Sequence, residues 1–322
     1  MVPTLQQVRE ARTRIAPFAI RTPLVRIDVE GHDVWLKLEN LQPIGAFKIR
    51  GAASAMTAAP RDALARGVYT ASAGNMAQGV AYCARAMGVP CTVIVPDRAA
   101  AAKVDAIERL GASVMKVSFD EWWQTMVDRC HPSQTGFFVH PFEDSLVMAG
   151  NGTIALEISE DLPGVDYVFA PWGGGGLSCG IAAALRELRP DARVVPIEVD
   201  VAAPLTASYA AGRATEIVPS PNFVDGMSGK SVFPRMWEAA NALLDRPRAV
   251  SVAQIADALR YLVSRAHIVP EGAGAAPFAA ARSALGDSRV APGVSTPKIV
   301  CVVSGGNIDH ARLVSILRGE LP

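Results

Sequence analysis

The sequence has no excess of either charge and no long apolar run. Its 322 residues contain 31 lysines and arginines against 31 aspartates and glutamates, so the formal net charge is zero. Proteins that bind nucleic acid usually present a basic face, and we therefore expect no nucleic-acid partner. No apolar stretch approaches the roughly 20 residues that a membrane-spanning helix requires, so we expect no membrane partner. Residues 1–16 lack the apolar core of a signal peptide, and their apolar spacing predicts a surface helix.

Cysteine is scarce as well. The chain has five cysteines, and none of them forms a CxxC pair. This scatter argues against a disulfide framework and a zinc site, and it favours reduced thiols in the cytoplasm. Because each cysteine lies in an apolar segment, we predict that all five are buried in the core. They are Cys83, Cys91, Cys130, Cys179 and Cys301.

Short segments rich in valine and isoleucine alternate with longer alanine-rich segments. This alternation predicts an α/β fold in which helices cover both faces of mostly parallel sheets. The chain is long enough for two lobes rather than one. The predicted strands are residues 34–39, 68–72, 91–95, 113–117, 166–171, 193–199 and 298–303, and the predicted helices are 76–87, 101–110, 177–188, 251–266 and 307–317.

Lys48 stands between apolar neighbours, directly before an alanine-rich segment that predicts a helix. Burial lowers the pKa of a lysine amine, and the neutral amine is a nucleophile that forms a Schiff base with an aldehyde. Most lysines near a helix start are simply solvated. The interpretation of Lys48 as a nucleophile therefore depends on whether the ends of other predicted strands carry residues that could bind a cofactor and a substrate.

Four glycines, Gly173 to Gly176, follow one predicted strand and precede a helix. Backbone N–H groups at such a turn can surround an anion without obstruction by side chains, which predicts a phosphate-binding loop. The sequence fits neither a Walker loop nor a complete dinucleotide fingerprint. Glu198 does stand where a ribose-binding acid is expected. The interpretation as a nicotinamide-dinucleotide site is therefore less favoured but stays open.

Two further strand ends carry small polar residues. Ser72, Ala73, Gly74 and Asn75 precede a helix and are suited to a carboxylate, although Ser72 could also serve only as an N-cap. Ser304 follows the last predicted strand. Its hydroxyl could bond a heterocycle nitrogen or simply cap the helix expected at 307–317.

Together, and in this order, these segments resemble the pyridoxal-phosphate (PLP) enzymes of fold type II, in particular threonine and serine dehydratases and serine racemases. The likeness extends along most of the chain. It rests on residues 22–24, 36–42, 45–52, 72–75, 140–142, 173–176, 225–226 and 304–307, with Glu271, Gly274 and Ala275.

The resemblance implies that Lys48 carries the cofactor covalently and that Ser72 to Met76 bind the substrate carboxylate. The cofactor-binding residues it implies are Phe47, Lys48, Asn75, Gly173, Gly174, Gly175, Gly176, Gly226 and Ser304. It also implies a large domain formed by residues 1–50 and 146–322, a small domain of residues 51–145, and a homodimer. Ser304 is neutral, which makes the pyridine ring a weaker electron sink and favours β-elimination.

The implied reaction removes the β-hydroxyl and the amino group of a β-hydroxy amino acid such as serine or threonine. In this reaction the substrate amine displaces Lys48, and the freed lysine amine removes the α-proton. The β-hydroxyl then leaves, and hydrolysis yields a 2-oxo acid and ammonia. The alternatives are a lyase or β-replacement enzyme for a bulkier substrate, such as 3-hydroxyaspartate or phenylserine, and a silent PLP-binding protein.

The chain departs from this family at several positions. Racemases have a serine where this chain has Ala73, so we expect no efficient racemisation. Met76 and Trp172 are bulkier than their counterparts, which predicts either repacking or a pocket for a larger substrate. Some relatives bind a divalent cation through a glutamate and an aspartate. Glu198 matches the first, but Pro204 replaces the second, so we expect no metal.

Overall fold

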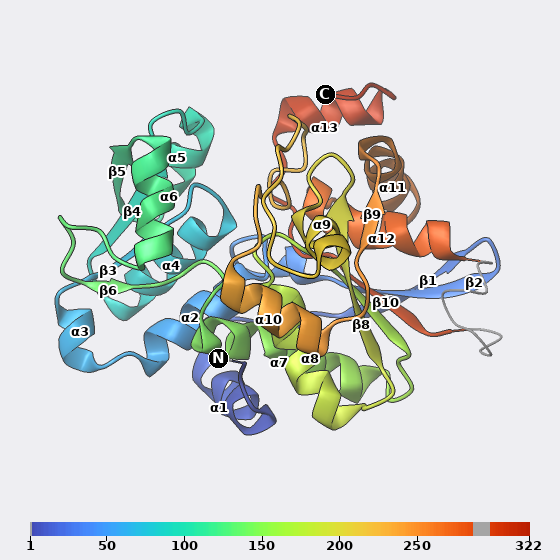
Figure 1. Cartoon of the computed structure of the whole chain (residues 1–322), viewed down its shortest axis with the longest axis horizontal. Helices are drawn as coiled ribbons and strands as arrows, with labels where there is room; N and C mark the ends of the chain where they lie inside the picture. Colours follow the sequence, from blue (N-terminus) through green and yellow to red (C-terminus); the bar gives the residue numbers. More distant parts are fainter. Residues whose placement is uncertain (1, 286–296) are drawn as a thin grey trace.

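The computed structural model describes residues 2–285 and 297–322 and contains two separate sheets (Figure 1). The larger sheet has the order β1-β2-β10-β7-β8-β9, and only the β1–β2 hairpin is antiparallel. Its strands are β1 (Leu24–Val29), β2 (His32–Lys37), β7 (Tyr167–Pro171), β8 (Arg193–Val199), β9 (Arg248–Val250) and β10 (Ile299–Val302). The predicted parallel α/β architecture is confirmed.

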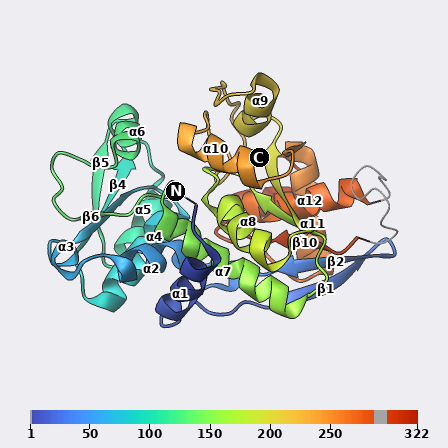
Figure 2. The ribbon, with the colours of Figure 1, turned by 60° about the horizontal axis from the view of Figure 1, so that its bottom comes forward.

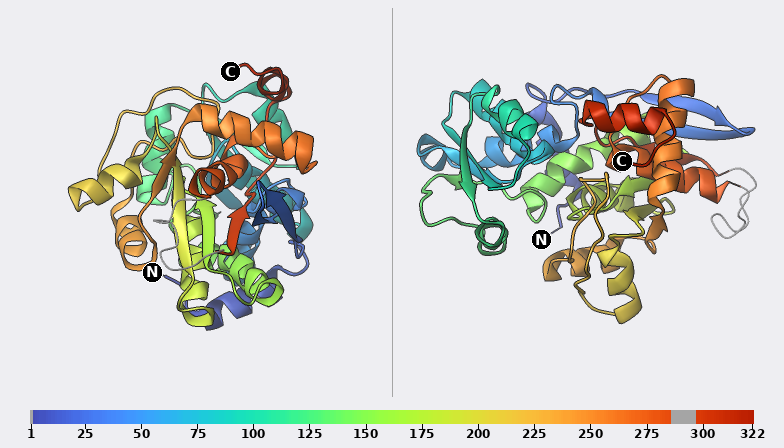
Figure 3. Two further views of the ribbon diagram at one scale, coloured as in Figure 1. Left: turned by 90° about the vertical axis from the view of Figure 1, so that its right-hand side faces the viewer. Right: turned by 90° about the horizontal axis from the view of Figure 1, so that it is seen from above.

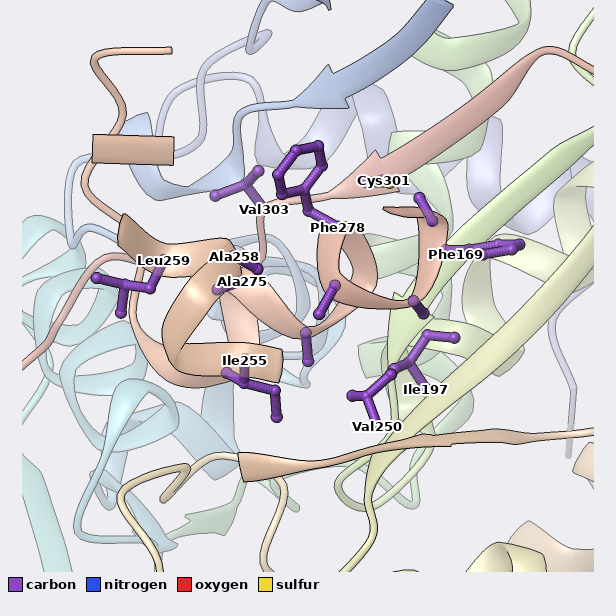
Figure 4. Packing of buried hydrophobic residues seen from close by; sticks show 14 of the residues in the cluster. Phe169, Ile197, Val250, Ile255, Ala258, Leu259, Ala275, Phe278, Cys301 and Val303 are labelled. Carbon is purple, nitrogen blue, oxygen red and sulfur yellow. The ribbon is translucent and has the colours of Figure 1, made fainter. Parts of the chain in front are cut away.

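Helices lie on both sides of the larger sheet, as the end-on view in Figure 3 shows. Successive residues of a strand point to opposite faces, so the strands contribute to two apolar clusters. Phe169 and Cys301 pack with α11 (Val252–Arg265) and α12 (Gly272–Ala284) on one face (Figure 4). Val168 and Val300 pack with the helices of the other face. Those are α1 (Leu5–Ile15), α7 (Ser145–Asp161) and α8 (Gly176–Leu188).

The smaller sheet is entirely parallel and has the order β5-β4-β3-β6. Its strands are β3 (Val68–Ala71), β4 (Cys91–Pro96), β5 (Ser113–Val117) and β6 (Phe137–Phe138). The helices of this part are α3 (Arg61–Ala65), α4 (Asn75–Met87), α5 (Ala101–Glu108) and α6 (Phe119–Asp128). Apart from α2, the other helices of the described chain are η1 (Glu39–Leu41), α9 (Pro204–Ala211), α10 (Pro234–Leu243) and α13 (His310–Leu317).

Helix α2 (Lys48–Ala58) lies between the two sheets, beside α7 and α4 (Figure 2). Its Arg50 is buried and donates to Glu39, with distances of 2.8 and 2.9 Å, and to Glu157 of α7, with distances of 2.7 and 2.9 Å. Lys37 of β2 donates to the same Glu157 at 2.5 Å. Burial opposes the ionised form of Glu157, but Arg50 and Lys37 outweigh it and lower the pKa of the carboxyl. This buried ion cluster ties α2 to β2 and α7.

Two sequence-based predictions are wrong. Cys130 is exposed, whereas the other four cysteines are buried. It follows Arg129, which has a positive φ of 58° and turns the chain away at the end of α6. The last helix begins at His310 with Asp309 as its N-cap rather than at Asn307, because Gly305 and Gly306 pair with Ala46 and Gly45 instead. Within the described residues, no helix is long and apolar enough to cross a membrane.

We predict that Glu157→Gln lowers the free energy of unfolding by about 3 kcal/mol or more, because it leaves the buried cations Arg50 and Lys37 undercompensated. Urea denaturation followed by circular dichroism measures the change. Glu160→Gln on the same helix is the control. Glu160 is 45% exposed and pairs with Arg12 and Arg21, so its loss should cost less than about 1 kcal/mol. Equal effects of the two substitutions would contradict the importance of the buried cluster.

Candidate active site

Lys48 is the first residue of α2, and its side chain is partly buried. Its Nζ donates to the carbonyl oxygen of Pro141 at 2.6 Å and lies 5.3 Å from the centre of the Phe47 ring. Burial lowers the pKa of the amine to about 8, although the carboxylate of Glu271 acts in the opposite direction. A substantial fraction of this amine is therefore neutral and nucleophilic near pH 8.

The glycine loop has space for no side chain at any of its four positions, and at Gly175 a Cβ would lie 2.3 Å from the Trp172 ring. A Cβ at Gly173 would lie 2.5 Å from the Gly226 carbonyl oxygen, and one at Gly174 would lie 2.2 Å from the Phe142 ring. At Gly176 the obstacle is the Phe142 carbonyl oxygen, at 2.7 Å. Gly175 has a φ of 89° and is the N-cap of α8. The first N–H groups of a helix have no acceptor within it, so this loop is suited to an anion.

Residues 140–142 bring the amine and the loop together. Pro141 accepts the hydrogen bond of Lys48, and the ring of the next residue, Phe142, covers Gly174. The turn is held by His140, whose Nδ1 accepts from the N–H groups of Phe142 at 3.2 Å and Glu143 at 2.8 Å. Burial and nearby cations lower the pKa of His140 to about 3, so its imidazole is neutral.

The loop before α4 reaches the same region. Gly74, not Ser72, is the N-cap of α4, and the Ser72 hydroxyl accepts from the Gly74 N–H at 3.2 Å. Asn75 donates to Glu271 at 2.8 Å, which places the start of α4 beside the residue whose charge acts on Lys48. Ala73 is partly buried against the apolar cluster of the smaller sheet. Met76 is only 1% exposed, and its side chain belongs to that apolar cluster.

The last two predicted positions adjoin these residues. Ser304 is buried, and its carbonyl oxygen accepts from the Phe47 N–H at 2.9 Å, next to Lys48. It caps no helix, since Asp309 caps α13. Gly226 lies against Gly173 and near Glu271, whose Oε1 would be 3.8 Å from a Cβ at position 226. All the residues singled out from the sequence thus lie around one region between the two sheets.

Sequence reasoning assigned no role to four residues of this region. Pro141 and Phe142 hold the amine and the loop, and Glu271 and Asn307 contact Asn75. Burial raises the pKa of Glu271 to about 7, although hydrogen bonds from Asn75 and the Asn307 backbone oppose the rise. All four belong to the segments on which the family resemblance rests. Their position in those segments is the sequence feature that could have indicated a role in the site.

The two bulky departures and the cation position have a structural explanation. Trp172 is 1% exposed and packs against Leu205 and Met236, so both it and Met76 are part of apolar cores. The Glu198 carboxylate accepts from the Leu205 and Thr206 N–H groups, each at 2.8 Å, and from the Thr206 hydroxyl at 2.7 Å. Its oxygens thus serve the start of α9. No cluster of three or more histidine, cysteine or acidic side chains suited to a metal occurs within residues 2–285 and 297–322.

Comparison with known proteins identifies the family. A family model described as pyridoxal-phosphate dependent enzyme matches residues 15–305. The chain belongs to this family. It is 41% identical over 308 residues to the L-threonine ammonia-lyase of Geobacter sulfurreducens, covering 94% of this chain and 75% of the relative. It is 36% identical over 326 residues to the catabolic L-threonine dehydratase TdcB of Staphylococcus aureus, covering 99% and 93%.

The solved structure of maize serine racemase has the same fold as this PLP enzyme. The two superpose with a TM-score of 0.87 at 30% sequence identity, covering 99% of this chain and 98% of the racemase. The local geometry also fits the cofactor. The glycine loop at the start of α8 is suited to a phosphate. The Lys48 amine donates to the carbonyl oxygen of Pro141, and the next residue, Phe142, lies against this loop.

We predict that Gly174→Ala weakens PLP binding more than tenfold, because carbon atoms need about 3.5 Å and the new Cβ would lie 2.2 Å from the Phe142 ring. Equilibrium titration of the cofactor-free protein measures the loss. Removing the obstacle in the Gly174→Ala, Phe142→Ala double variant should recover part of the affinity. Gly229→Ala is the control, since its Cβ would meet only the Gly173 oxygen at 3.7 Å. A Gly174→Ala variant that binds like the control would contradict the steric argument.

The lowered pKa of Lys48 predicts how the attachment of PLP depends on pH. Below about pH 8 the ammonium form prevails and has no lone pair, so the rate should fall about tenfold per pH unit. Above about pH 8 the rate should level off, because the amine is already neutral. Borohydride trapping at successive times, followed by peptide mapping of Lys48, measures this rate. A rate that still climbs towards pH 10, as for a solvated lysine with a pKa of about 10.4, would show that burial does not act on the amine.

Proposed function

We propose that this PLP enzyme is an ammonia-lyase that converts threonine or serine into a 2-oxo acid and ammonia. The proposal rests on the position of the Lys48 amine. Its Nζ lies 2.6 Å from the carbonyl oxygen of Pro141, and the next residue, Phe142, lies against the glycine loop. The relatives named L-threonine ammonia-lyase and L-threonine dehydratase, at 41% and 36% identity, support the choice of substrate.

In this proposal Lys48 holds the cofactor, and Gly173 to Gly176 bind its phosphate through backbone N–H groups. Phe47 and Gly226 would flank the ring, Asn75 would contact its hydroxyl, and Ser304 would face its nitrogen. When bound, PLP supplies an electron sink that weakens the Cα–H bond of the attached amino acid. Ser304 is neutral and buried, so it cannot keep the ring nitrogen charged as a carboxylate would. That difference favours elimination over reactions that need a long-lived carbanion.

Lys48 also moves the proton. With the cofactor and substrate in place, its neutral amine would remove the α-proton of the substrate. The Pro141 carbonyl, which accepts from Nζ, orients the amine and stabilises the ammonium that forms. Because burial holds the pKa of Lys48 near 8, the amine is both a competent base and able to return the proton at neutral pH.

The start of α4 is proposed to bind the substrate carboxylate. A Cβ at Gly74 would meet no atom within 4 Å, so there is open space at the start of the helix, and Ser72, Ala73, Asn75 and Met76 complete the loop. Ala73 has no hydroxyl to deliver a proton to the face opposite Lys48. The proposal therefore includes no efficient racemase activity, although the maize relative is a serine racemase.

A pocket for a larger substrate is not supported. Met76 and Trp172, whose size raised this alternative, are each 1% exposed and point into apolar clusters. The proposal has four further features. They are a large domain of residues 1–50 and 146–322, a small domain of residues 51–145, a homodimer, and a cytoplasmic location.

A substrate panel tests the function. We expect the PLP-loaded protein to release 2-oxo acid and ammonia from L-threonine and L-serine at least about tenfold faster than from phenylserine, because the buried Met76 and Trp172 leave no added apolar space for its ring. The fourth substrate of the panel is 3-hydroxyaspartate. Coupled assays for 2-oxo acid and ammonia measure turnover, and chiral chromatography should detect little D-serine.

Lys48→Ala is the control for chemistry, and Lys116→Ala, on the exposed side of β5, is its matched surface control. The first should abolish turnover and the second should leave it unchanged. Release of no 2-oxo acid from any of the four substrates by a protein that binds PLP at Lys48 would overturn the proposal in favour of a silent binder. Faster turnover of phenylserine would favour the bulkier-substrate alternative.

A further inference from the structure

Four groups form a continuous hydrogen-bonded chain at the edge of the site. The amide nitrogen of Asn307 donates to the Ile44 carbonyl oxygen at 2.9 Å and to Asn75 Oδ1 at 2.8 Å. The amide nitrogen of Asn75 in turn donates to the Glu271 carboxylate at 2.8 Å. Asn75 begins α4 beside the smaller sheet, whereas Glu271 is the N-cap of α12 beside the larger one. The chain therefore joins the two parts of the molecule.

The backbone carbonyl at the Ile44 end of this hydrogen-bonded chain determines the direction of every bond in it. A backbone carbonyl only accepts, so the end of the Asn307 amide that faces Ile44 must be its NH₂ group. The second hydrogen of that NH₂ group then points to Asn75, which must answer with its oxygen. The Asn75 NH₂ group is thereby turned towards Glu271, whose carboxyl oxygen accepts from it. One of its two hydrogens bonds Glu271, and the other remains for a ligand.

Two glycines make room for the chain. A Cβ at Gly45 would lie 2.8 Å from Asn307 Oδ1, and a Cβ at Gly305 would lie 2.7 Å from Glu271 Oε1. The Glu271 N–H also donates to the Gly305 carbonyl oxygen at 2.8 Å. The side chains of Asn307 and Glu271 thus occupy space that is free only because residues 45 and 305 are glycines.

We propose that Asn307 and Glu271 are positioning residues that hold the Asn75 amide with its nitrogen, not its oxygen, available to the PLP ring oxygen. The inference rests on the proposed function for the contact between Asn75 and the cofactor. An oxygen atom of Asn75 in that place would repel the electron-rich ring oxygen, so an amide turned by 180° would bind the cofactor less tightly. The same chain anchors the start of α4, which is proposed to bind the substrate carboxylate.

The test compares Asn307→Asp, Glu271→Gln and the double variant with Asn241→Asp. Asn241 is an exposed residue of α10 and controls for the added charge. The carboxylate that Asn307→Asp introduces cannot donate to Ile44 or Asn75, and we expect it to weaken PLP binding about tenfold. It should also speed amide hydrogen exchange of residues 72–78 in the cofactor-free protein. The side-chain amide that Glu271→Gln introduces can still accept from Asn75, so we expect a change of less than about threefold.

The double variant distinguishes a change in the orientation of the Asn75 amide from a simple loss of its hydrogen bonds. Position 307 then carries an acceptor and position 271 can donate, so the Asn75 amide can turn over and satisfy both neighbours. We expect the exchange of residues 72–78 to return towards the wild-type rate while PLP binding stays weak. If Asn307→Asp matches Asn241→Asp in both measurements, or if the double variant regains full PLP affinity, the inference is overturned. Hydrogen exchange needs no cofactor, so it is independent of whether the wild-type protein attaches PLP at Lys48.

Discussion

The buried ion cluster around Arg50 is the interaction on which the site depends. Arg50 is two residues beyond Lys48 on α2, and its guanidinium bonds Glu39, just after β2, and Glu157 of α7. A buried cation with this many partners cannot move without leaving charges uncompensated, so the register of α2 is held against the larger sheet. The position of the Lys48 amine at the end of that helix follows from this constraint.

The glycine loop is held by a steric constraint rather than by charge. Phe142 lies against Gly174, and the Pro141 carbonyl oxygen accepts from Lys48. One short segment therefore sets the distance between the amine and the glycine loop. His140 stabilises this segment as a neutral hydrogen-bond acceptor. The amine, the glycine loop and the start of α4 thereby come to one place although they lie far apart in the sequence. This convergence at strand ends is the general property of open α/β sheets.

Much of the fold could be predicted from local patterns. All seven predicted strands exist, and the capping box formed by Ser251 and Gln254 starts α11. Strands β1, β6 and β9 were not predicted, because short or edge strands carry little of the buried apolar pattern. The helix expected from Asn307 begins later, since Gly305 and Gly306 bond Ala46 and Gly45, which are distant in the sequence. The exposure of Cys130 likewise depends on where the chain leaves α6.

Local sequence is enough to specify the alternation of strands and helices, the glycines after β7, and a lysine at the start of a helix, because these depend on neighbouring residues and on backbone sterics. The packing of distant segments places the Met76 and Trp172 side chains in apolar cores. It also brings Glu198 to the start of α9 and Glu271 to Asn75. Burial, the pKa of a buried group and the partner of a buried carboxylate depend on which distant segments pack together. Local sequence carries no direct record of that packing.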